Sequence, residues 1–399
     1  MATGLSKQQV ARQALRLAAI QPPENSDLEL AGAILPGAVA ATIIQTSLLW
    51  DMSWHFSIGR DNFWTPAHLA IYLGTLLGVA TAAITIARSS QIAWKHPASS
   101  RWVSVLGFHG PAGAWVTLVG SAAMLASGFF DDWWHRVYGL DVAVLSPPHV
   151  ILILGMAVVQ LGFWMMARVV ISESPSSKGL RLAGNWLAGT FVLALAVLIT
   201  EQTFRTYMHG ARFWLTVSLV FPFALVGFRI SGDRWGATQA ALGYTVVRLL
   251  VLWILPLFPA EPRLGPVFSP VTHMVPPDFP LLLIVPAFAL DLMLQRKEHA
   301  LPTWRLAFSL GGVFLLMLLV VQWPFAIFLL SRASRVAFFA TDNFRYSLPS
   351  LTHTVRGEFF TEGEPPLFAF VAITASFLVA MLSARAGLAL NHWAGRLRR

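Results

Sequence analysis

The sequence predicts an all-α fold, a polytopic bundle of about ten transmembrane helices with an internal hairpin repeat in its N-terminal half. Composition is the first reason: 56% of the 399 residues are hydrophobic and only 12% are charged, about half the charged share of a soluble domain. The second reason is that apolar stretches recur, each near the roughly 20 residues needed to cross a bilayer. Lipid offers the backbone no hydrogen-bond partner, so such stretches must be helical.

The apolar stretches divide the chain into spans and connecting segments. The predicted spans are residues 29–50, 67–88, 104–130, 149–171, 181–201, 212–230, 237–258, 279–295, 306–331 and 366–389. Residues 1–28 are mostly polar and are expected to form a cytoplasmic or interfacial segment. Residues 332–365 are the longest predicted loop. Region 29–175 carries the repeat, and region 176–399 is expected to be an additional transmembrane region.

Lysine and arginine predict the orientation of the bundle. With ten spans both termini lie on one side, and that side collects about twice as many basic residues as the other, so the termini are expected in the cytoplasm. The expected location is a bacterial-type inner membrane. Most histidines then fall on the extracytoplasmic side, together with many Asp and Glu residues. These histidines are His55, His68, His135, His149, His209, His273 and His353.

Composition also limits the chemistry and the partners. The chain has no cysteine, which excludes disulfides, thiolate zinc sites and cysteine-ligated iron–sulfur clusters. A metal ion would have to be held by His, carboxylate, Met or backbone groups. The net charge of +9 is expected from cytoplasmic loops beside lipid headgroups. The expected partner is therefore the lipid bilayer, and no nucleic acid.

Two segments of the N-terminal half repeat one polar pattern, with one inserted residue. The first copy is Asp51, Trp54, His55, Gly59, Asp61, Thr65, Pro66 and His68. The second copy is Asp131, Trp134, His135, Gly139, Asp141, Ser146, Pro147 and His149. Each copy begins where one apolar span ends and closes where the next begins, so each is expected to form the turn of a helix hairpin.

The spacing within each copy predicts a shared site. Asp51 and His55 are four residues apart and therefore lie on one face of a helix end. Gly and Asp suit the turn, and Thr-Pro is a helix-start signal, so His68 falls in the first turn of the returning helix. One carboxylate and two imidazoles around a point would suit a borderline cation. The corresponding residues of the second copy are Asp131, His135 and His149.

A structural interpretation stays open for the same residues. A single histidine at a membrane interface is usually a satisfied polar residue, and Asp–His hydrogen bonds could simply join the two helices of a hairpin. Ionisable residues at membrane depth are, however, rare and tend to be functional. The other such residues inside spans, Arg248 and Asp291, either pair with each other or line a cavity.

The motif pair resembles the C subunit of the membrane-bound copper monooxygenases, the particulate methane and ammonia monooxygenases. The resemblance covers about residues 30–170 and includes Arg60 beside Asp61. It implies one copper site at Asp51, His55 and His68, and a second site at Asp131, His135 and His149. It also implies a trimer of three-subunit protomers that inserts oxygen from O2 into a small hydrophobic or nitrogenous substrate.

The sequence departs from that family in two ways. The family has Asn at the position of Asp131, and one carboxylate with two imidazoles is also the ligand set of non-haem iron, so iron or zinc remains an alternative to copper. The second half has no counterpart in the C subunit. It resembles the family's A subunit over residues 265–291, and a B-like part would come from another chain or be absent.

Further residues are expected around the metal ligands. Asp61, Asp141 and Asp132 are predicted to lie behind the ligands and to orient the imidazole rings. Trp54 and Trp134 are predicted to form a dry wall of the pocket. Two other functions stay open beside the monooxygenase: transport or delivery of copper or zinc, and a purely structural membrane protein.

Overall fold

A computed structural model describes residues 25–95, 102–139, 146–173, 177–230, 232–298, 301–347 and 366–397. The structure is about 75% helical, and the ten α-helices of its described part follow the ten predicted spans in order. Eight of these helices are long and apolar enough to cross a membrane. The predicted all-α fold class is therefore confirmed, and the chain is a multi-pass membrane bundle.

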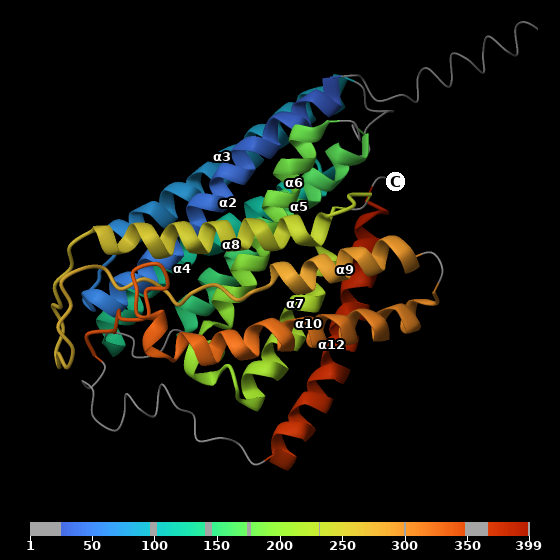
Figure 1. Cartoon of the computed structure of the whole chain (residues 1–399). Coiled ribbons are helices and arrows are strands. Elements are labelled where there is room, and N and C mark those ends of the chain that lie inside the picture. The colour runs from blue at the N-terminus through green and yellow to red at the C-terminus, as the bar shows by residue number, and fades with distance from the viewer. Residues whose placement is uncertain are drawn as a thin grey trace, which may run out of the picture.

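The helices form a single bundle in which α2 and α3 lie side by side and α8 packs mainly against α6 and α9 (Figure 1). The helices are α2 (Asn25–Ser57), α3 (Pro66–Lys95), α4 (Ala112–Tyr138), α5 (Pro147–Glu173), α6 (Lys178–Leu198), α7 (Ala211–Gly227), α8 (Gly236–Ile254), α9 (Ile284–Lys297), α10 (Thr303–Leu329) and α12 (Pro366–Ala394). Short 3₁₀ turns are η2 (Thr200–Gln202), η3 (Arg205–Tyr207), η4 (Leu255–Leu257) and η5 (Arg332–Ser334).

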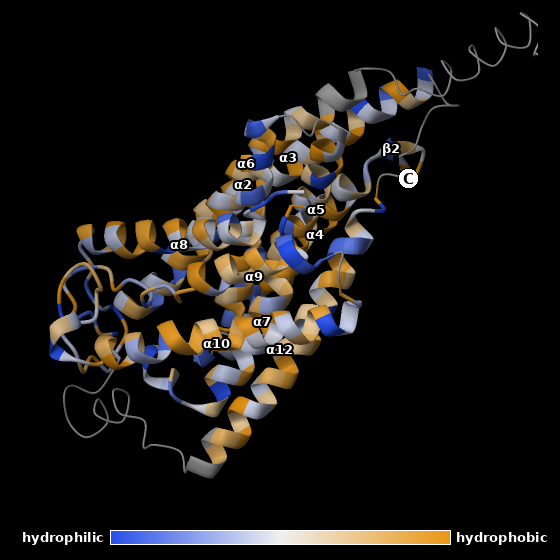
Figure 2. Cartoon of the chain, turned by 45° about the vertical axis from the view of Figure 1, so that its right-hand side comes forward, coloured by the Kyte–Doolittle hydropathy of each residue, from blue (hydrophilic) through white to orange (hydrophobic). Residues whose placement is uncertain are grey.

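Hydrophobic side chains cover much of the outer surface of the bundle. Figure 2 shows hydrophobic residues along α8, α10 and α12. Large apolar side chains on these helices are exposed, including Leu250, Leu316 and Phe370. Contact of this apolar surface with the lipid chains of a bilayer is favourable, whereas its exposure to water is not.

The helix ends at both motifs follow the sequence signals. Pro66 begins α3 and Pro147 begins α5, as expected for proline, whose missing N–H is not needed in a first helical turn. Helix α2 continues past the predicted end at residue 50 as far as Ser57. Asp51 and His55 therefore lie on its last two turns.

Two predicted spans begin later than expected. The third was predicted from residue 104, but β1 (Val103–Val105) and β2 (Phe108–Gly110) form an antiparallel hairpin there, and α4 begins at Ala112. The hairpin turn is Leu106-Gly107, with φ angles of 50° and 83°. Two positive φ angles match the right-handed twist of the strands.

The eighth predicted span, 279–295, also begins later than expected. Its first part is extended, and α9 begins only at Ile284, because a proline-rich stretch cannot form a helix. The prolines are Pro276, Pro277 and Pro280. Side chains from other helices satisfy the extended backbone, as membrane burial requires. The amides of Val275, Leu281 and Leu282 donate to the side chains of Ser57, Tyr244 and Gln322, respectively.

Helices α4 and α5 approach closely at glycines. A Cβ added at Gly162 would lie 2.5 Å from the carbonyl oxygen of Gly113, and one at Gly120 would lie 2.8 Å from that of Gly155. Small residues allow such backbone contact between membrane helices. This contact sets how the second motif's two halves, one on each helix, face each other.

Replacing Gly162 with leucine should therefore separate α4 from α5. Overpacking of this kind costs about 1–3 kcal/mol, and the melting temperature of the detergent-purified protein should fall accordingly. Gly32→Leu is the matched control, because a Cβ at Gly32 meets nothing within 4 Å. Equal melting temperatures for both variants would show that the α4–α5 contact is not a tight one.

Candidate metal centre

The first hairpin brings four side chains together. Asp51 and His55 come from the end of α2, His68 from the first turn of α3, and Asp61 from the loop between them. Nε2 of His68 lies 3.1 Å from Oδ1 of Asp51 and 3.6 Å from Oδ2 of Asp61. Nε2 of His55 lies 3.8 Å from Oδ2 of Asp51 and 3.5 Å from Oδ2 of Asp61. Two carboxylates and two imidazoles thus meet at one point.

Asp61 occupies a different position from the one predicted. The sequence analysis placed it behind the imidazoles, whereas its carboxylate faces Nε2 of both His55 and His68. The reason is the path of the loop: Gly59, at φ 83°, turns the chain back so that Asp61 points inward beside Asp51. Its position in a short turn between two metal-ligand candidates was the signal available in the sequence.

Three of the four carboxylate oxygens of this cluster are buried without hydrogen bonds. The Asp61 side chain is 1% exposed, and neither of its oxygens has a hydrogen-bond partner. The same holds for Oδ1 of Asp51 and Nε2 of His55; the 3.1 Å contact between Asp51 and His68 is close but does not have hydrogen-bond geometry. Each buried polar group left unsatisfied costs about 1–3 kcal/mol, and charged groups cost more. Positive charge would compensate these atoms, either from a protonated imidazole of His55 or His68 or from a bound cation.

The loop holds His68 in one tautomer. Nδ1 of His68 lies 2.9 Å from the carbonyl oxygen of Asn62, which can only accept, so Nδ1 carries the proton. The loop itself is held by Thr65, whose hydroxyl accepts from the Asn62 amide, and by Asn62, whose side chain accepts from the Trp64 amide. The lone pair of a neutral His68 therefore lies on Nε2, facing the carboxylates. This arrangement is typical of a metal-bound histidine.

The second hairpin also brings its three predicted residues together. Oδ1 of Asp131 lies 3.7 Å from Nε2 of His135 and 3.5 Å from Nε2 of His149. This oxygen is buried and accepts no hydrogen bond. The second cluster thus has one carboxylate where the first has two.

The remaining predicted neighbours have other contacts. Asp132 forms an ion pair with Arg136 at 2.6 Å, which is not the ring-orienting contact predicted for it, and Asp141 lies outside the described residues. The Trp54 indole donates to the carbonyl oxygen of Arg60 and so supports the loop of the first hairpin. Trp134 packs against Tyr138 at 4.4 Å between ring centroids.

Tyr72 lies between the two clusters and was not identified from the sequence. It is one turn after His68 on α3, with 6.4 Å between the ring centroids. A Cβ on Gly128, one turn before Asp131 on α4, would lie 3.0 Å from its ring. Carboxylates of both clusters act electrostatically on the Tyr72 hydroxyl. The i, i+4 spacing from His68 was the signal that could have revealed it.

The C-terminal half covers the first hairpin. The Val275 amide donates to the Ser57 hydroxyl at 2.7 Å, and the Arg263 amide donates to the Ile58 carbonyl at 2.8 Å. Tyr346 donates its amide to the Phe56 carbonyl, and its burial raises the pKa of its hydroxyl. The two regions separated in the sequence analysis therefore meet at the first hairpin.

A groove of about 1190 Å³ runs beside the first hairpin. Trp50 and Trp54 of α2 line it, and Ile254 of α8 and Phe258 form part of its opposite side. Its walls are mainly apolar, and Trp54 directly precedes His55. An apolar molecule dissolved in the bilayer would find a matching surface here.

The two ionisable residues inside predicted spans do not pair with each other. Asp291 accepts from the amides of Ala237 and Thr238 at the start of α8, and Arg248 donates to the Asp278 carbonyl. His209 contacts the Trp323 carbonyl, and burial lowers its pKa. His353 lies outside the described residues.

The clusters are looser than a closed metal site. Among the described residues, no group of three or more His, Cys, Asp or Glu side chains is already arranged to hold an ion. Donor atoms about 2.0–2.1 Å from a tetrahedral ion lie about 3.3 Å apart, so the 3.5–3.8 Å contacts would contract by a few tenths of an ångström on binding.

Comparisons with known proteins identify no relative of this chain: no family model, no curated protein and no solved structure matches it.

Proposed function

We propose that this chain is a copper-dependent membrane monooxygenase, or a subunit of one, that oxidises a small hydrophobic or nitrogenous substrate with O2. The observation that supports the proposal is the convergence of Asp51, His55, Asp61 and His68, with buried oxygens that accept no hydrogen bond. The proposed reaction is taken from the resemblance of the motif pair to the copper monooxygenases.

Charge supports a divalent cation at the first cluster. Two ionised carboxylates side by side in an apolar bundle are strongly unfavourable, and one divalent ion would neutralise both. Imidazole and carboxylate together suit copper, zinc and iron, and copper(II) is the tightest-binding of the three. The second cluster, with one carboxylate and two imidazoles, also suits iron(II).

The residues around the clusters have distinct roles in this proposal. Asp51, His55, His68 and Asp61 would hold the first ion, which would supply the electron transfer and O2 activation that protein side chains lack. The Asn62 carbonyl orients His68. The groove beside Trp54 would admit an apolar substrate from the bilayer and exclude water from the reacting atoms.

The proposal extends to the assembly and its orientation. By resemblance the chain would form trimers and work with A-like and B-like subunits, unless its own second half serves as the A-like part. By the distribution of Lys and Arg the termini would be cytoplasmic, with the clusters at the extracytoplasmic face of an inner membrane. Cysteine labelling of single-cysteine variants from outside intact cells tests this orientation.

The reaction is tested with copper-loaded protein in bilayers, supplied with a reductant and either a short alkane or ammonia. We expect copper-dependent O2 consumption and a hydroxylated product, both lost in Asp51→Asn and retained in Asp132→Asn. Ala70→Trp, which narrows the groove, should raise the KM for the alkane and leave copper content unchanged. If no substrate in these two classes drives O2 consumption by fully loaded protein, the monooxygenase proposal is wrong.

Metal transport is the second candidate. The extended segment before the short helix α9 resembles the broken helices at which transporters bind ions. Here, however, side chains accept hydrogen bonds from the amides of that segment. The Asp291 carboxylate likewise accepts hydrogen bonds from the first amides of α8. Uptake of copper or zinc by proteoliposomes, abolished by Asp51→Asn, would favour transport over oxidation.

A further inference from the structure

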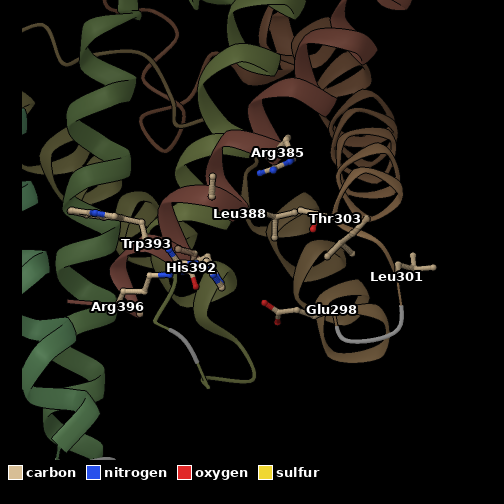
Figure 3. Close-up of a pocket in the computed structure, with 12 residues that line it drawn as sticks. Glu298, Leu301, Thr303, Arg385, Leu388, His392, Trp393 and Arg396 are labelled. Atoms are coloured by element: carbon tan, nitrogen blue, oxygen red, sulfur yellow. Dashed lines mark hydrogen bonds between the residues drawn. The ribbon is translucent and has the colours of Figure 1, made fainter. Parts of the chain in front are cut away.

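A pocket of about 650 Å³ opens at the other end of the bundle, between the α9–α10 connection and the last turns of α12. Figure 3 shows His392 and Arg396 at the end of α12 on one side, Glu298 and Leu301 on the other, and Arg385 farther back along α12, nearer to Thr303. The pocket is separate from both hairpin clusters, and nothing in the proposed function uses it.

The pocket has an excess of positive charge. Arg385 and Arg396 line it, and its one acidic residue, Glu298, already pairs with Arg229. A guanidinium nitrogen of Arg396 lies 2.9 Å from Nε2 of His392, which can accept that hydrogen bond only as a neutral imidazole. No carboxylate among the described lining residues is left for Arg385 or Arg396.

Two further sets of N–H donors in this pocket have no hydrogen-bond acceptor, and an anion would provide one. Nε of Arg385 is buried and makes no hydrogen bond. Thr303 begins the 27-residue helix α10, whose N-cap, Pro302, provides no capping side chain. First-turn N–H groups and the helix dipole both favour an anion there.

The surroundings are those of a membrane interface. Trp304 lies under the guanidinium of Arg385, 5.4 Å from it, and is 57% exposed; Trp393 is 45% exposed. Exposed tryptophans gather at headgroup level. Leu301, Leu306 and Leu388 line the pocket beside the charged groups, so an apolar surface continues from the basic one.

We propose that this pocket binds the phosphate of an anionic membrane phospholipid. Arg385, which lies over Trp304, would hold the phosphate at the start of α10, and Arg396 would add positive charge farther along the same pocket. The acyl chains would follow the leucines toward the lipid-facing surface of α12. Basic pockets between membrane helices recognise anionic headgroups in this way. The apolar lining distinguishes a lipid phosphate from a free phosphate ion, which would gain nothing from it.

Native mass spectrometry of the whole protein in detergent tests the proposal, with added phosphatidylglycerol, phosphatidylcholine or inorganic phosphate. We expect phosphatidylglycerol to bind most tightly, and Arg385→Gln and Arg396→Gln each to weaken it about fivefold. Arg88→Gln, an exposed arginine near the end of α3, should change nothing.

Three results would overturn the proposal. They are equal binding of the two lipids, displacement of phosphatidylglycerol by millimolar phosphate, and unchanged binding in Arg396→Gln. Because Arg396 is exposed, its variant should fold even if Arg385→Gln does not. The lipid preference of the wild-type protein is independent of either variant.

Discussion

Changing Asp51 to alanine should lower the affinity of the first hairpin for copper by at least about 100-fold, because even groups behind a metal ligand contribute about 10–100-fold. Asp51 contacts both imidazoles of the cluster, so its loss removes the carboxylate that they share. Metal analysis of purified protein after dialysis against a copper buffer measures this directly.

The same experiment separates the two hairpins. Asp131→Ala should remove metal from the second cluster and leave the first loaded, so the two single variants should each lose a different ion. Asp132→Ala is the matched control, because Asp132 pairs with Arg136 and not with a histidine. Equal metal content in Asp51→Ala, Asp132→Ala and wild type would remove the metal assignment.

Asp61→Asn should raise the stability of the metal-free protein and reduce the extra stability that added metal provides. In the metal-free protein the two buried oxygens of Asp61 accept no hydrogen bond, so neutralising the side chain should raise the free energy of unfolding by about 1–3 kcal/mol. Added metal stabilises the wild type by about 2.7 kcal/mol at 100 times its Kd. The variant binds metal more weakly and should show a smaller increase.

Thermal melting with and without a chelator measures both parts of this prediction. Asp233→Asn is the control: Asp233 is paired with Arg181 at 2.6 Å and with Asn185 at 2.5 Å, so its loss should destabilise the protein under both conditions. If Asp61→Asn behaves in the same way as Asp233→Asn, the Asp–His contacts join the hairpin helices and hold no ion.

The helix hairpins at the two motifs were predictable because their signals are local. Spacing of four residues places Asp51 with His55 and Asp131 with His135, and a proline two residues before each returning histidine begins the next helix. Helical geometry and chain connectivity then bring His68 and His149 back to these pairs. The spans were predictable for a similar reason, since each apolar stretch must form its own backbone hydrogen bonds in lipid.

Proline placement shows where local reasoning was incomplete. Residues 279–283 are apolar enough to be read as the start of a span, yet they are extended, and side chains from three other helices satisfy backbone amides in and just before this segment. Those partners, Ser57, Tyr244 and Gln322, are distant in sequence, so hydropathy could not reveal them.

By itself, the sequence determined the helical class, the order of the helices and the six residues that meet at the two hairpins. Only the tertiary structure decided that Asp61 joins Asp51 and both imidazoles, that Tyr72 lies between the clusters, and that residues near 275 and 346 cover the first hairpin. The physical reason is the range of the interactions. Helix periodicity and hairpin turns act over a few residues, whereas burial of the carboxylates depends on contacts between segments more than 200 residues apart.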